Sequence, residues 1–340
     1  MKGFRLFGFF VVFALLAASC APAATPTAAP AAPAAPATAV PAAPQPTTPP
    51  AAPAATQPPA QPTAVPATAT AAAPTPVATI DPASLVQKGR LLICTDFPYP
   101  PQEFYDENGN PQGLDIEIGT EIASRLGLQA VFVNSVFDTI FAAVTSGKCD
   151  IVISATNITA DRQKQVSMIP YFNAGQSFLV LKGNPANINS TNDLCGTSVA
   201  AESGTTEADY LQGTGDYKGK GLTQACSTAG KKPITTVVTQ KDSDALQQLQ
   251  ANKVVAYFTD SPVAAYYTVQ HPDLFQLTGT VLNATLEGIG VPCGQADCTK
   301  APLSAVGTGV QTVLKSMMTD GTYLKILTKW NLANSAVQPQ

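Results

Sequence analysis

Residues 21–80 contain 17 prolines and not one Asp, Glu, Lys or Arg, and most of the other residues are Ala and Thr. Such a stretch has too little bulky apolar surface to offset the conformational entropy that folding costs. The composition therefore predicts a disordered, extended tether here. The remainder of the chain, about 260 residues, is long enough for one large domain or two ordinary ones.

The N-terminus has the order of a secretory signal. Met1–Arg5 is basic, Leu6–Leu16 is apolar, and small residues follow up to Ser19. Cys20 comes next, and this arrangement resembles a bacterial lipobox, which implies a signal over 1–19, a lipidated Cys20 and a tether over 20–84. The alternative is a plain signal peptide with an incidental Cys20. We expect an extracytoplasmic protein, lipid-anchored to the outer face of the bacterial cell membrane or periplasmic.

Charge and hydropathy exclude two classes of function. Removal of the signal would take away Lys2 and Arg5, which leaves 17 of the 19 basic residues. With 23 acidic residues, the remaining chain has a net charge of −6. A nucleic-acid partner is not expected, because phosphate binding needs a basic face. No apolar run of 18 or more residues follows the N-terminus, so contact with the membrane is expected only through the lipid.

Six cysteines remain if Cys20 carries lipid, and an even number in an exported chain suggests disulfides. Cys293 and Cys298 enclose a short loop and are predicted to form a local bridge. Cys195 and Cys226 are 31 residues apart and are predicted to be a second pair.

Cys94 and Cys149 are the doubtful pair. The expected strand alignment puts them about three residues out of register, roughly 10 Å along the strand, which is too far for a disulfide. Buried free thiols are therefore the alternative to a bridge, and the sequence leaves the pairing of these two cysteines open. No metal or other cofactor is expected, because His271 is the only histidine and no Cys-x-x-Cys occurs.

From residue 91 onward the apolar pattern alternates between strands and helices. The predicted strands are 91–95, 128–133, 151–153 and 254–258, and the predicted helices include 114–126, 137–144, a helix from about 159, and 261–269. This alternation predicts an α/β fold with parallel sheets, in which ligands sit beyond the carboxyl ends of strands. The residues at these ends are Asp96, Ala155 to Asn157, Glu202 to Thr206, and Thr259 with Asp260.

Five segments together resemble one family. They are 95–104 with 107–109 and 113–115, 154–162, 204–206, 259–262 and 320–330. In this order they are similar to the polar amino acid-binding proteins of ABC importers, the bacterial extracellular solute-binding proteins of family 3. The resemblance implies a type II periplasmic-binding-protein fold of two lobes with parallel or mixed sheets, joined by crossing strands near 176–181 and 288–292. Lobe 1 is expected over 85–181 and 285–334, and lobe 2 over 182–284.

The same resemblance implies the function and the partners. The expected function is to close around one free amino acid and deliver it to a membrane permease, and we expect a monomer. Burying a zwitterion requires a countercharge for each of its groups. Arg162, in the first turn of a predicted helix, matches the family's carboxylate clamp. Asp260 matches its ammonium site, and the alternative for Asp260 is an N-cap of the next helix.

The other expected contacts surround the ligand. By the resemblance, Tyr99 and Phe137 are aromatic walls, and core packing is the alternative for Phe137. Asp96 matches a position that contacts the ligand's side chain. The remaining expected ligand-binding residues are Ala155, Asn157, Glu202 and Thr206.

Glu202 facing the ligand beside Asp96 predicts an acidic pocket and hence a cationic or strongly polar ligand such as arginine, lysine, histidine or glutamine. Glu202 pointing to solvent is the alternative.

Catalysis has little support in the sequence. No Gly-x-Ser-x-Gly elbow or Walker loop occurs, so we expect a binding protein. The alternative is an enzyme on the same fold, of the prephenate or arogenate dehydratase type, that uses Asp96 or Glu202 as an acid.

Overall fold

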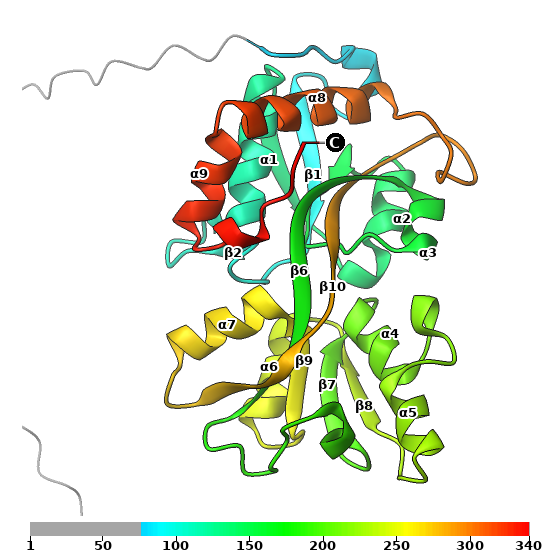
Figure 1. The fold of residues 1–340 in the computed structure, drawn as a ribbon. Coiled ribbons are helices and arrows are strands. Elements are labelled where there is room, and N and C mark those ends of the chain that lie inside the picture. Colours follow the sequence, from blue (N-terminus) through cyan, green and yellow to red (C-terminus); the bar gives the residue numbers. More distant parts are fainter. Residues whose placement is uncertain (1–75, 340) are drawn as a thin grey trace, which may run out of the picture. The chain divides into compact units, whose positions relative to one another are not determined.

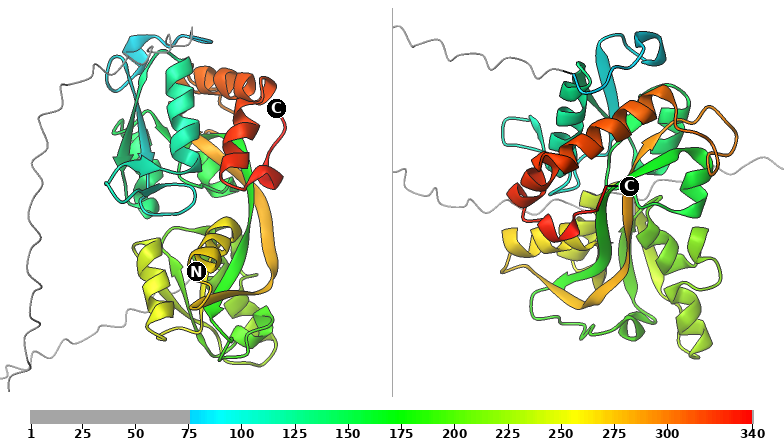
Figure 2. Two further views of the ribbon diagram at one scale, coloured as in Figure 1. Left: turned by 90° about the vertical axis from the view of Figure 1, so that its left-hand side faces the viewer. Right: turned by 45° about the horizontal axis from the view of Figure 1, so that its top comes forward.

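The computed structural model describes residues 76–339, shown in Figures 1 and 2. Cys20, the signal and most of the expected tether lie outside the described residues. The folded part begins before the expected boundary at residue 85. The Val77 N–H donates to the Arg125 carbonyl at 2.8 Å, and Ile80 is buried in the core. Ile80 is the large apolar side chain that the preceding Pro/Ala/Thr segment lacks, so its burial stabilises this stretch.

One mixed sheet of eight strands runs through the described residues, in the order β4-β1-β5-β10-β6-β9-β7-β8. The strands are β1 (Arg90–Thr95), β4 (Gln129–Asn134), β5 (Ile151–Val152), β6 (Ser167–Leu181), β7 (Ser198–Glu202), β8 (Thr235–Thr239), β9 (Ala256–Asp260) and β10 (Phe275–Val291). β4, β1 and β5 are parallel, and so are β9, β7 and β8. The short strands β2 (Phe104–Tyr105) and β3 (Pro111–Gln112) form a separate pair.

Helices cover both faces of each half of the sheet (Figure 1). We call the half with β1, β4 and β5 lobe 1 and the half with β7, β8 and β9 lobe 2. Lobe 1 contains α1 (Leu114–Arg125), α2 (Ile140–Thr145), α3 (Ala160–Gln165), α8 (Ala305–Thr319) and α9 (Thr322–Lys329). Lobe 2 contains α4 (Thr206–Gln212), α5 (Leu222–Thr228), α6 (Asp242–Gln250) and α7 (Ser261–Gln270). Among residues 76–339, no helix combines the length and the apolar character that crossing a membrane requires.

The two long strands β6 and β10 connect the lobes, as Figures 1 and 2 show. They pair antiparallel from Phe275 opposite Leu181 in lobe 2 to Val291 opposite Ser167 in lobe 1. The two expected sheets are therefore continuous through these strands, and both crossings are longer than expected. Their pairing shifts register between Thr278 and Leu282, between Leu282 and Thr285, and between Glu287 and Gly288. The two-lobed α/β fold is confirmed, and the lobe boundaries at 181 and 285 stay a prediction.

Several apolar patterns of the sequence form the helices and strands that they predicted. The stripe over 114–126 is α1, and Gly127 follows it with φ +70°, a conformation that ends a helix and favours glycine. The strands predicted at 91–95, 128–133 and 151–153 are β1, β4 and β5 within one or two residues. The carboxyl ends of these three strands therefore lie within one residue of the expected positions, whereas β9, predicted at 254–258, extends to Asp260.

The sequence left the pairing of Cys94 with Cys149 open, and the structure joins them with a Cα–Cα distance of 5.7 Å. The predicted register was right, since Cys94 lies opposite Val152, three residues beyond Cys149. Cys149, however, precedes β5 and does not continue it, so the offset along the strand does not separate the two residues. The predicted pairs Cys195–Cys226 and Cys293–Cys298 are both present.

Candidate functional site

The polar ends of strands from both lobes meet at one cavity with about 340 Å³ of empty space. The predicted residues that line it are Asp96, Tyr99, Phe137, Ala155, Asn157, Glu202 and Asp260. The other two predicted residues, Arg162 and Thr206, line a second cavity that shares Phe137 with the first. The structure thus brings the predicted residues together between the lobes. We call the first of these spaces the cleft cavity.

Arg162 connects the two lobes at one end of the site. Thr159 is the N-cap of α3, and its side chain accepts a hydrogen bond from the Arg162 backbone N–H at 3.2 Å. The buried guanidinium donates to the carbonyls of Asn157 (2.9 Å) and Gly204 (3.0 Å). These bonds use two of its five N–H donors, so the others remain to bind a carboxylate.

Two aromatic rings flank the Arg162 guanidinium. Its central carbon lies 5.3 Å from the centroid of Phe137 and 5.6 Å from that of Phe141, within the range of cation–π attraction. Phe137 is only partly buried and lies outside the buried core clusters of the described residues. Its role as a wall of the site is therefore better supported than simple core packing.

Asp260 has a buried carboxyl group, and one of its two oxygens lacks a hydrogen-bond donor among the described residues. Oδ2 accepts a hydrogen bond from the Tyr99 hydroxyl at 2.7 Å, while Oδ1 has no hydrogen-bond partner among the described residues. Asp260 is the N-cap of α7, but its side chain makes no capping hydrogen bond. Burial, followed by the charges of Glu207 and Glu287, raises the pKa of Asp260 well above its ordinary value. An ammonium group would supply the missing donor and countercharge.

Asn157 and Thr206 join the lobes beside Arg162. The Thr206 hydroxyl donates to Asn157 Oδ1 at 2.6 Å and accepts from Gln176 Nε2 at 2.8 Å. The buried Asn157 Nδ2 has no acceptor among the described residues, so it is available to a ligand oxygen. Ala155 lines the cleft cavity, but its backbone N–H donates to Asp115 Oδ2 at 2.9 Å. That N–H is thereby used within the protein.

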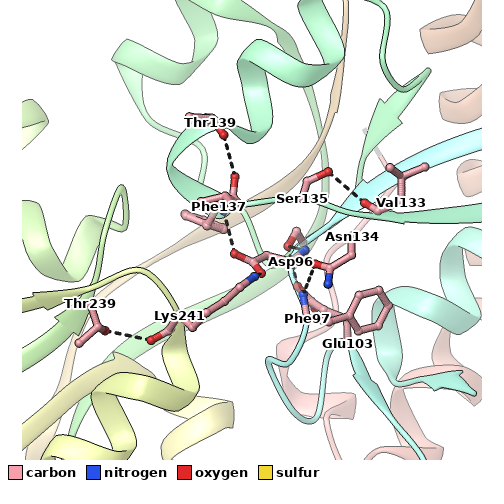
Figure 3. Close-up of polar contacts among 12 residues, drawn as sticks. Asp96, Phe97, Glu103, Val133, Asn134, Ser135, Phe137, Thr139, Thr239 and Lys241 are labelled. Carbon is pink, nitrogen blue, oxygen red and sulfur yellow. Dashed lines mark hydrogen bonds and ion pairs between the residues drawn. The ribbon is translucent and has the colours of Figure 1, made fainter. Parts of the chain in front are cut away.

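Lys241 is a cation that the sequence analysis missed. Its ammonium pairs with Asp96 Oδ1 across the lobes, while Asp96 Oδ2 accepts the Phe137 backbone N–H at 2.7 Å (Figure 3). Lys241 lies two residues beyond the carboxyl end of β8, a strand that was not among those predicted. Had the strand been recognised, the rule that ligands sit at strand ends would have pointed to this residue.

Glu202 faces the cleft cavity and does not point to solvent. Burial is the largest cause that raises its pKa, to about 10, and the charges of Asp242 and Asp96 add to the effect. Burial also raises the pKa of Asp96, against the opposing influence of Lys241. The two expected acidic side chains are both present. Lys241 balances the charge of Asp96, and the raised pKa of Glu202 keeps that side chain protonated and neutral.

The raised pKa of Glu202 predicts how stability depends on pH. The folded protein retains a proton that the unfolded chain releases above pH 4.5, so this contribution is complete below pH 4.5 and declines as pH rises towards 10. The ligand-free protein should therefore melt at a lower temperature at pH ~8 than at pH ~5. Glu202→Gln, which cannot ionise, should show a smaller decrease. Calorimetric melts of both proteins test this, and equal decreases would contradict it.

The comparisons with known proteins agree with one another. The model of the family described as bacterial extracellular solute-binding proteins, family 3, matches residues 91–333. The L-cystine-binding protein TcyJ of Escherichia coli (strain K12) is 24% identical over 245 residues, which cover 72% of this chain and 83% of that protein.

Two solved structures are also similar. An ancestral arginine-binding protein bound to arginine is 34% identical with a TM-score of 0.60, covering 71% of this chain and 98% of that one. The ancestral amino acid-binding protein AncCDT-1, a precursor of cyclohexadienyl dehydratase, is 31% identical with a TM-score of 0.59, covering 71% and 95%.

Proposed function

The chain belongs to the bacterial extracellular solute-binding proteins of family 3, and from this premise we propose that it is the substrate-binding component of an ABC importer. It binds a polar or cationic L-amino acid between its lobes and delivers it to the membrane permease. The names of TcyJ and of the ancestral arginine-binding protein, which bind amino acids, support this assignment.

The observation that carries the proposal is that Arg162 and Asp260 each have hydrogen-bonding capacity that the described residues leave unused. Arg162 has N–H donors left for an α-carboxylate, and Asp260 has an unsatisfied oxygen for an α-ammonium. The charge of Asp260 also acts on Arg162, which supports the proposal that one small zwitterion contacts both residues. Because Arg162 lies on lobe 1 and Asp260 on lobe 2, the ligand stabilises the closed arrangement of the lobes.

The N-terminal part of the proposal rests on the sequence. We propose that Cys20 is lipidated after removal of residues 1–19, so that the binding unit is held at the outer face of the cell membrane or in the periplasm. The Pro/Ala/Thr segment then separates this unit from the lipid, and the protein meets its permease as a monomer.

Thermal unfolding with each of the twenty amino acids tests the binding function. A ligand at 100 times its dissociation constant should stabilise the signal-free protein by about 2.7 kcal/mol and raise its melting temperature. At least one polar or cationic amino acid should produce this shift. If none of the twenty does, the proposed function is wrong.

The dehydratase type is the second candidate, because AncCDT-1 is described as a precursor of such an enzyme and Glu202 retains a proton in the cleft cavity. A proton on a buried carboxyl suits a general acid. Incubation with prephenate, followed by detection of the aromatic product, distinguishes this candidate. We favour binding, since the curated relative and the two ancestral proteins bind amino acids.

A further inference from the structure

The charged groups of the site form two sets, one around Arg162 and one around Lys241, and charges of both sets act on the buried Asp242. The carboxylates that act most strongly on Arg162 are Glu207 and Asp260. Asp96 instead interacts with Lys241 and Glu202. Phe137 lies between the two sets, since its ring flanks the Arg162 guanidinium while its backbone N–H donates to Asp96.

If Arg162 and Asp260 bind the α-carboxylate and α-ammonium, as the proposed function states, Asp96 and Glu202, which line the cleft cavity, meet the ligand's side chain, and Lys241 acts on it through its ion pair with Asp96. We call Asp96, Glu202 and Lys241 the distal set.

Lys241 is held in position to reach across the cleft. It lies between β8 and α6, and its backbone carbonyl accepts a hydrogen bond from the Thr239 hydroxyl at 2.9 Å. From this point on lobe 2 the side chain extends to Asp96 on lobe 1, as Figure 3 shows. The Lys241 side chain is 28% exposed and that of Asp96 is 5% exposed. The pair is therefore well shielded, and solvent screens its charges less than those of a surface pair.

The distal set has no net charge but many hydrogen-bonding groups. The charges of Asp96 and Lys241 cancel, and Glu202 retains its proton because burial raises its pKa to about 10. The set offers N–H donors from Lys241, an O–H donor from Glu202 and carboxyl oxygens as acceptors. These groups suit an uncharged polar end such as an amide or a ureido group. A guanidinium or ammonium, by contrast, would meet Lys241 as a like charge and compete with it for Asp96.

We propose that Lys241 is a specificity-determining residue, which makes the site select amino acids with an uncharged polar side-chain end and reject arginine and lysine. This inference rests on the proposed function and narrows it. In this role the Lys241 ammonium neutralises Asp96, the carboxylate that a cationic ligand would otherwise pair with.

Calorimetric titration with matched pairs of amino acids tests the inference. L-citrulline has nearly the shape of L-arginine without its charge, and L-glutamine and L-lysine form a second pair that differs in charge, with the lysine side chain one atom longer. The wild-type protein should bind the uncharged member at least tenfold more tightly. In Lys241→Met the ammonium is lost but most of the apolar stem remains, so the ratio should fall at least tenfold and cationic ligands should gain affinity. Lys241→Gln should behave in the same way.

Two control variants distinguish the loss of the positive charge at Lys241 from the effects of changing a lysine side chain. Lys241→Arg retains the positive charge and should keep the preference for the uncharged ligands. Lys253→Met removes an exposed lysine of the same lobe and should change no ratio. Unfolding curves of each variant verify that it is folded before titration.

Either of two results would overturn the inference. One is a wild-type protein that binds arginine or lysine more tightly than the uncharged partner. The other is an unchanged ratio in folded Lys241→Met and Lys241→Gln. If none of these four ligands binds the wild type or the variants, this inference falls, whereas the proposed function falls only if the full panel of twenty also gives no thermal shift.

Discussion

Replacing Arg162 with alanine should weaken amino acid binding at least ~30-fold, because truncating one partner of a buried charge pair costs about 2–5 kcal/mol. The ligand's carboxylate would then enter a closed site without a countercharge. The variant also loses the hydrogen bond from Arg162 to the Gly204 carbonyl on lobe 2, and with it a contact that holds the lobes together. Isothermal titration with the amino acid identified by the panel measures the loss.

Two further variants make this test specific. Arg162→Lys retains the positive charge but loses the bidentate fork, so it should bind more weakly than the wild type and more tightly than Arg162→Ala. Arg90→Ala removes an exposed arginine at the start of β1 and should leave the affinity unchanged. A folded Arg162→Ala protein that binds within tenfold of the wild type would show that the carboxylate is bound elsewhere.

The double variant Cys94→Ala/Cys149→Ala should lose about 4 kcal/mol of unfolding free energy through loop entropy, since this bridge closes a separation of 55 residues. The loss corresponds to a fall in melting temperature of roughly 10 °C for a unit of this size. The reason lies in the unfolded chain, which gains conformational freedom when the bridge is removed. Denaturant titration of both proteins measures the difference.

Cys293→Ala/Cys298→Ala is the matched control, because its bridge spans a separation of only 5 residues. The same relation predicts a loss of about 2 kcal/mol for this double variant. Intact mass after alkylation, with and without reduction, counts the bridged cysteines. Equal losses in the two double variants, or a loss below about 1 kcal/mol at Cys94 and Cys149, would contradict the prediction.

Much of the site was predictable from the sequence because it follows local patterns. Short apolar runs gave the strand ends, and at those ends lie Asp96, Asn157, Glu202 and Asp260 in the structure. The family resemblance pointed to Arg162, and the local capping signal Thr159 placed it in the first turn of α3. These features depend on residues near one another in the chain, where periodicity and capping chemistry apply.

Lys241 was not predictable in the same way. The short strand β8 contains threonines and is followed by polar residues, so its apolar pattern is too weak to predict a strand. The partner of Lys241 is Asp96, which lies 145 residues earlier in the chain. Only the closed arrangement of the lobes brings the two side chains together. The charge of the distal set, and with it the proposed selectivity, therefore depends on tertiary structure.

By itself, the sequence determined the α/β class and the order of most elements, because these follow from local periodicity, and its resemblance to the family predicted Arg162 and Asp260 for an amino acid's two charged groups. Only the tertiary structure decided that Cys94 reaches Cys149, that β6 and β10 join both lobes in one sheet, and that Lys241 faces Asp96. Each of these depends on where distant segments meet. The packing of the whole fold around its cores decides which distant segments come into contact, and local sequence patterns do not predict this packing.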